Sequence, residues 1–95
     1  MDEVTKSKVM EVCEAYNVLF NQFSESKRAK RDEVDAKTII SYYLFKTAKM
    51  KQREIARWLR ISRSLVATNV KRFEDMFEFN KEFRKVCDNL DIYKI

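Results

Sequence analysis

The chain has 95 residues, which is enough for one domain, residues 1–95, with a modest hydrophobic core, and it carries a net charge of +5. It contains no glycine, proline or histidine, and its two cysteines lie far apart in the sequence. Tight hairpins and phosphate-binding loops usually need glycine, and a zinc finger needs about four closely spaced ligands. The composition therefore argues against β-hairpins, glycine-rich phosphate loops and zinc fingers, and it favours an all-α fold.

The first 33 residues predict a helix followed by a basic loop. Apolar residues at helical spacing indicate a helix over residues 4–16, followed by a short second piece over residues 19–23. Residues 24–33 have one apolar side chain and hold four closely spaced cations, so this segment is interpreted as a loop. The cations are Lys27, Arg28, Lys30 and Arg31.

The next predicted helix is central to the core. Asp35 is a plausible N-cap, since its carboxylate can accept from free backbone N–H groups and is favoured by the helix dipole. Apolar side chains then recur every three or four residues through Ile39, Ile40, Tyr43 and Leu44 to Thr47. The pattern breaks over residues 48–51.

Three further helices are expected. A short one spans residues 52–59, a turn follows at residues 60–62, and a longer helix capped by Ser62 spans residues 63–77. Asn80 can cap a last helix that carries Phe83, Val86, Cys87 and Leu90. Cys13 and Cys87 both lie on apolar stripes and are interpreted as buried structural thiols.

The charge is concentrated in one stretch. Residues 1–26 have a net charge of −3, whereas residues 46–72 carry nine cations against Glu54 alone, a net charge of +8. A solvated face usually mixes both signs, so this stretch favours a polyphosphate partner. The nine cations are Lys46, Lys49, Lys51, Arg53, Arg57, Arg60, Arg63, Lys71 and Arg72.

Two helices joined by three residues have the layout of a helix-turn-helix. Ala56 is small enough to let the helices approach, and Ile55, Leu59, Ile61 and Val66 supply the apolar contacts. The second helix then presents to solvent a set of side chains that suits base reading in the major groove. The predicted base-reading residues are Arg63, Ser64, Ala67 and Thr68, and the predicted backbone contacts in this half of the chain are Lys51, Arg53, Arg60 and Lys71.

Arg60 stands where many helix-turn-helix turns have glycine. The turn must therefore hold a non-glycine residue at positive φ, at a cost of about 1 kcal/mol, or take another conformation.

The sequence resembles the C-terminal DNA-binding domain of the bacterial replication initiator DnaA, in the Trp-repressor-like group. The similar segments are residues 14–18 (EAYNV), 26–31 (SKRAKR), 36–42 (AKTIISY), 54–55 and 63–75 (RSLVATNVKRFED). The chain lacks the family's Asp-His-Thr signature, its Gly-Gly turn and its ATPase domain.

The resemblance implies a compact multi-helix bundle that binds double-stranded DNA. It also implies that Lys37 contacts DNA beside the basic loop and that one of Lys27, Arg28, Lys30 or Arg31 enters the minor groove. Arg63 and Ser64 would occupy the family's base-reading positions. The expected role is regulation of transcription or replication.

Three alternatives stay open at this stage. The basic surface could bind a replication or transcription protein instead of DNA, and the chain could also form a homodimer. RNA binding needs exposed aromatic platforms, for which Trp58, Tyr42 and Phe45 are the candidates. An enzyme is the weakest alternative, because the usual general base is missing and the carboxylates are scattered, so no catalytic residue, cofactor or metal is expected. Without a signal peptide or a bilayer-spanning apolar run, a cytoplasmic, nucleoid-associated location is expected.

Overall fold

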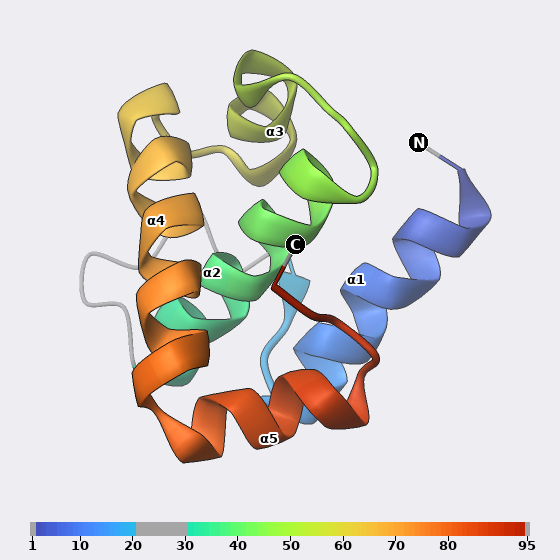
Figure 1. Cartoon of the computed structure of the whole chain (residues 1–95). Helices are drawn as coiled ribbons and strands as arrows, with labels where there is room; N and C mark the ends of the chain where they lie inside the picture. Colours follow the sequence, from blue (N-terminus) through green and yellow to red (C-terminus); the bar gives the residue numbers. More distant parts are fainter. Residues whose placement is uncertain (1, 21–30, 95) are drawn as a thin grey trace.

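The computed structural model describes residues 2–20 and 31–94, and its regular structure in these ranges is entirely helical (Figure 1). The prediction of an all-α multi-helix bundle is confirmed. The helices are α1 (Glu3–Ala15), α2 (Arg31–Lys46), α3 (Gln52–Leu59), α4 (Arg63–Phe79) and α5 (Lys81–Asn89).

Helix α2 is the central element of the bundle. It packs between α1 and α4, while α3 lies at one end and α5 crosses below from the end of α4 towards α1 (Figure 1). Ile39, Ile40 and Leu44 are completely buried, as the helical spacing predicts. Because α2 contacts α1, α3 and α4, it is the support on which the candidate site is built.

The start of α2 differs from the prediction. The helix begins at Arg31, so Asp35 is not its N-cap but lies one turn inside it, with its side chain buried. Asp32 and Glu33 occupy the first turn, where their negative charges are favoured by the helix dipole. The prediction of a loop through Glu33 is therefore wrong at its C-terminal end, since the polarity of residues 31–33 reflects a helix start.

Helix α1 closely matches its predicted span of residues 4–16. Asp2 caps it by accepting a hydrogen bond from the Thr5 backbone N–H, at 2.8 Å. At the other end of the bundle, Lys8 donates to the Leu90 carbonyl oxygen at 2.8 Å, which ties α1 to the segment after α5. The short helical piece predicted over residues 19–23 falls mostly outside the described residues.

Phe73 on α4 is the centre of the aromatic core. Its ring stacks on Tyr42 of α2 with centroids 3.9 Å apart, and it contacts Phe83 of α5 edge to face at 5.5 Å. Cys13 and Cys87 are both free and buried, which confirms the structural interpretation of these thiols. Burial raises the pKa of Cys13 to about 11 and that of Cys87 to about 12.

The last two helices share one polar residue between them. Asn80 ends α4, which runs two residues further than predicted, and its side chain caps α5 by accepting from the Phe83 N–H at 3.0 Å. Phe77, near the end of α4, is partly buried against the core. The helices described here include none that is long and apolar enough to span a membrane.

Candidate nucleic-acid interface

Helices α3 and α4 have the predicted layout of two helices joined by a short turn, residues 60–62. Arg60 adopts the left-handed conformation, with φ 58° and ψ 45°, so the first of the two predicted alternatives is the observed one. The Ala56 carbonyl oxygen accepts from the backbone N–H groups of both Arg60 and Ile61. These bonds satisfy the end of α3 and set the direction in which α4 leaves the turn.

Helices α3 and α4 are in contact, and the residues predicted to pack between them are buried or partly buried. Ile55, Leu59 and Val66 are buried, and Ala56 has little exposed surface. Ile61 packs partly against the same core. Together with the caps, these contacts fix one face of each helix and leave the opposite faces to solvent.

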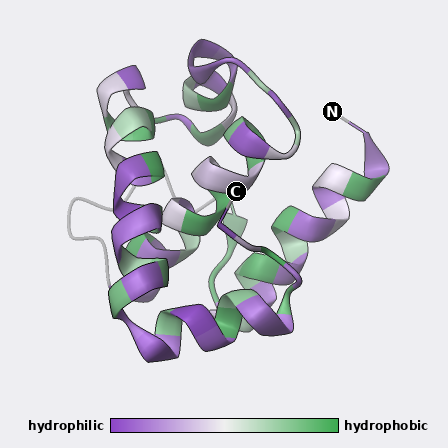
Figure 2. Ribbon diagram, viewed as in Figure 1, coloured by the Kyte–Doolittle hydropathy of each residue, from purple (hydrophilic) through white to green (hydrophobic). Residues whose placement is uncertain are grey.

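Helix α4 has one polar face and one buried face. Val66, Val70 and Phe73 are buried, whereas the five side chains predicted to point outward are all exposed. Figure 2 shows hydrophilic and hydrophobic residues alternating along α4, as expected for a helix with one buried side. The exposed set is Arg63, Ser64, Ala67, Thr68 and Lys71.

The hydroxyl groups at the start of α4 are partly engaged within the helix. Ser62 caps it by accepting from the Leu65 N–H at 3.1 Å, and its Oγ lies 3.2 Å from the Oγ of Ser64. Thr68 donates its hydroxyl proton to the Ser64 carbonyl oxygen at 2.9 Å. Thr68 is exposed, so its oxygen is left as an acceptor on the solvent side of α4.

Three arginines form a second group of exposed cations, on α3 and in the turn after it. Arg53 and Arg57 lie four residues apart on one side of α3, and Arg60 follows as its C-cap. All three are exposed. Lys51, at the start of α3, is exposed as well. Arg57 was not among the predicted contact residues, although its spacing from Arg53 was a sufficient signal.

Arg72 is set apart from the other cations by an ion pair. Its Nη2 lies 3.3 Å from Oδ1 of Asp35, and Nε of Arg31 lies 4.0 Å from the other carboxylate oxygen. Burial raises the pKa of Asp35, although the nearby Arg72 charge acts in the opposite direction. Arg72 therefore joins α4 to α2, and Arg31 lies at the start of α2 beside the same carboxylate.

Lys37 is the predicted contact residue that the structure does not present to solvent. Only 9% of its surface is exposed, and burial lowers the pKa of its ammonium group. It lies on α2 in the bundle interior, so a backbone contact through Lys37 is at odds with its burial. Lys27, Arg28 and Lys30 lie outside the described residues.

The aromatic candidates for RNA stacking are not free platforms. Tyr42 is completely buried, and Trp58 packs against Phe20 with ring centroids 4.6 Å apart. Phe45 is partly buried against the core. Among the described aromatic residues, the side chain most open to solvent is Phe79, 79% exposed, at the far end of α4 from Arg63.

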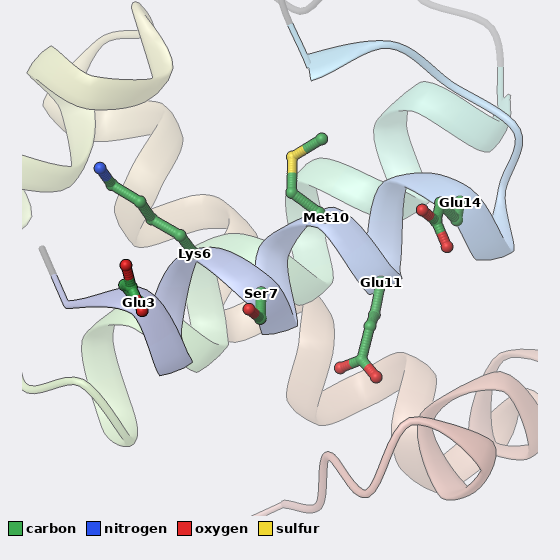
Figure 3. A pocket seen from close by; sticks show the side chains of 6 residues that line it. All are labelled: Glu3, Lys6, Ser7, Met10, Glu11 and Glu14. Carbon is green, nitrogen blue, oxygen red and sulfur yellow. The ribbon is translucent and has the colours of Figure 1, made fainter.

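A separate hollow of about 370 Å³ lies on the outer side of α1. Its lining comes from this helix alone, with Lys6 and Met10 projecting to one side and Glu11 to the other (Figure 3). It holds three glutamates and one lysine, so its charge is opposite to that of the α3–α4 surface. The residues that the structure describes include no group of His, Cys, Asp or Glu side chains that could hold a metal ion.

Comparison of the chain with protein-family models, with curated proteins and with solved structures returned no match. The resemblance to the DnaA C-terminal domain therefore stays a prediction from the sequence.

Proposed function

We propose that the chain binds double-stranded DNA sequence-specifically, with the exposed face of α4 in the major groove. The observation that carries this proposal is the outward face of α4, where a cation, two hydroxyl groups and a methyl group lie within the first two turns. Arginine reads guanine by a bidentate contact, hydroxyl groups bond to several bases, and a small apolar group fits the thymine methyl.

The exposed arginines of α3 and of the turn after it support the same orientation. In a helix-turn-helix the first helix crosses the DNA backbone while the second lies in the groove. Arg53 and Arg57 are exposed on the helix that would cross the backbone, and Arg60 is exposed in the turn after it. Lys71 lies further along α4. Each of these cations can neutralise a phosphate and release a counterion.

The engaged hydroxyl of Thr68 suggests which base edges it reads. Because its proton is donated to the Ser64 carbonyl, the oxygen is left to accept a hydrogen bond. In the major groove the exocyclic amino groups of adenine and cytosine are the donors. The proposed role of Thr68 is therefore to accept from one of these amino groups.

Titration against random duplex DNA at two salt concentrations tests the electrostatic part of the proposal. If about six cations contact phosphates, the affinity should fall roughly 10³-fold between about 50 and 200 mM salt. A flat salt dependence would instead favour an apolar protein-binding surface. Selection of bound sequences from a random duplex pool then tests whether base discrimination accompanies the binding.

A matched pair of variants locates the surface. Replacing Arg53, Arg57 and Arg60 by Gln removes three charges from α3 and the turn after it, and it should reduce both the affinity and the salt slope. The same replacement of Lys81, Arg84 and Lys85 removes three exposed charges from α5, at the other end of the bundle. Equal effects of the two triple variants would contradict a site on α3 and α4.

A further inference from the structure

A hydrogen bond between two buried polar side chains joins the candidate reading helix to the centre of the bundle. Asn69 on α4 donates from Nδ2 to Oγ of Ser41 on α2, at 3.2 Å. Asn69 is 4% exposed and Ser41 is completely buried. Burying an amide in an apolar core costs free energy unless its hydrogen bonds are made. The Asn69–Ser41 bond mainly offsets this cost, so the pair adds little net stability to the core.

The apolar contacts of α4 determine which side of the helix is buried, but they set its exact rotation less sharply than a hydrogen bond does. Val66, Val70 and Phe73 form a buried stripe, and apolar burial is non-directional. A hydrogen bond constrains both distance and angle. The Asn69–Ser41 pair therefore adds a directional contact to a side of α4 that is otherwise held by packing.

A small rotation of α4 matters at its outer face. With side chains, a helix is about 10–12 Å across, so a rotation of about 20° moves an outer side-chain tip by roughly 2 Å. Such a shift exceeds the tolerance of a hydrogen bond. Asn69 follows Thr68 directly and points about 100° away from it around the helix axis, so fixing the direction of Asn69 also fixes that of Thr68.

We infer that the Asn69–Ser41 pair is a positioning pair, which sets the rotation of α4 so that its outward side chains meet base edges in register. This inference rests on the proposed function and adds a determinant of specificity that does not touch DNA. The ion pair between Arg72 and Asp35 joins the same two helices further along, but Arg72 is partly exposed and its contact is weaker for that reason.

The decisive variant replaces both partners by apolar groups of similar shape, Asn69→Leu with Ser41→Ala. Removing both partners together leaves neither half of this hydrogen bond unsatisfied, so the double variant should stay folded. Its affinity for random duplex DNA and its salt slope should be unchanged. Its preference for the selected duplex over random duplex should fall roughly tenfold or more, the loss that goes with one misplaced base contact.

A control separates positioning from stability. Val9→Ala removes buried apolar surface on α1, away from α4, and should lower the unfolding temperature while leaving the preference for the selected duplex intact. Should the double variant fail to fold, Ser41→Ala alone, which removes one oxygen atom, takes its place in the same assays.

A measurement without DNA tests the rotation directly. Both native cysteines are buried, so a thiol introduced by Val70→Cys can be followed by its labelling rate under native conditions. Labelling should be several-fold faster in the double variant than in the parent chain, and not faster in Val9→Ala once unfolding is allowed for. Unchanged labelling together with unchanged discrimination would overturn the inference. A parent chain that shows no discrimination would overturn the proposed function itself.

Discussion

Nη2 of Arg72 on α4 donates to Oδ1 of Asp35 on α2 across 3.3 Å. One cation of the basic stretch therefore forms an ion pair that joins two helices of the bundle. Asp35 is buried, and burial raises its pKa above its ordinary value of 3.8 in spite of the nearby Arg72 and Arg31. The folded protein therefore binds this proton more tightly than the unfolded chain does. A proton held more tightly in the folded state stabilises it at low pH.

The pH dependence of stability should reveal this balance. The difference in unfolding free energy between the parent chain and Asp35→Asn should fall as the pH rises from 3.8 through the raised pKa of Asp35. Denaturant titrations of both proteins across this range measure it, with Asp75→Asn as a control for removing an exposed carboxylate of α4. A difference that grows with pH would mean that the arginines outweigh burial.

Arg63→Ala should weaken binding to the selected duplex by about 1–3 kcal/mol and relax the preference at a single base position. The reason is that a bidentate arginine contact discriminates one base pair from the others. Competition with duplexes that differ at one position measures the effect, and Lys81→Ala on α5 is the matched control. Site preference that survives Arg63→Ala unchanged at every position shows that another residue reads the bases.

Lys71 and Lys37 should behave differently, because Lys71 is exposed and Lys37 is buried. Lys71→Ala should lower the salt slope of binding by about one and weaken all sequences alike. Lys37→Ala should leave the slope unaltered and instead lower the free energy of unfolding, since the buried stem of the lysine is lost. A reduced salt slope for Lys37→Ala would show that this side chain reaches the DNA, as the family resemblance implies.

The helix pattern could be predicted from the sequence because apolar spacing determines which side of each helix is buried. Ile39, Ile40 and Leu44 on α2, and Val66 and Val70 on α4, lie where that spacing requires. The outward direction of Arg63 and Thr68 follows from the same periodicity. The sequence therefore predicts those parts of the candidate site that depend only on which side of a single helix faces outward.

The remaining features depend on contacts between helices that are distant in sequence. Aspartate is a common N-cap residue, so local propensity assigned that role to Asp35. Its actual partner, Arg72, lies 37 residues away in the sequence, where local propensity does not reach. Lys37 belongs to a helix that is buried nearly all round, where a basic side chain does not follow the usual rule of exposure. The pairing of Asn69 with Ser41 likewise depends on how α4 packs on α2.

Cys13 and Cys87 should react slowly with thiol reagents in the folded protein. Their raised pKa values, about 11 and about 12, leave almost no thiolate near neutral pH, and both side chains are buried. Labelling should therefore require opening of the bundle and should accelerate through the unfolding transition in denaturant. Rapid labelling of either cysteine at pH 8 without denaturant would contradict the packing of α1 and α5.

Arg60 provides a test of the turn, because its backbone and its charge can be separated. Arg60→Gly and Arg60→Ala both remove the cation, but only glycine adopts the left-handed conformation without a Cβ penalty. The glycine variant should therefore be more stable than the alanine variant by about 1 kcal/mol, measured by denaturant unfolding. Both should lose the same DNA affinity and the same part of the salt slope, since both lose one phosphate contact.

Equal stability of the two variants would show that the turn relaxes out of the left-handed conformation once the arginine is gone. A larger loss of DNA affinity in the alanine variant would show that the direction of α4 depends on this one backbone position.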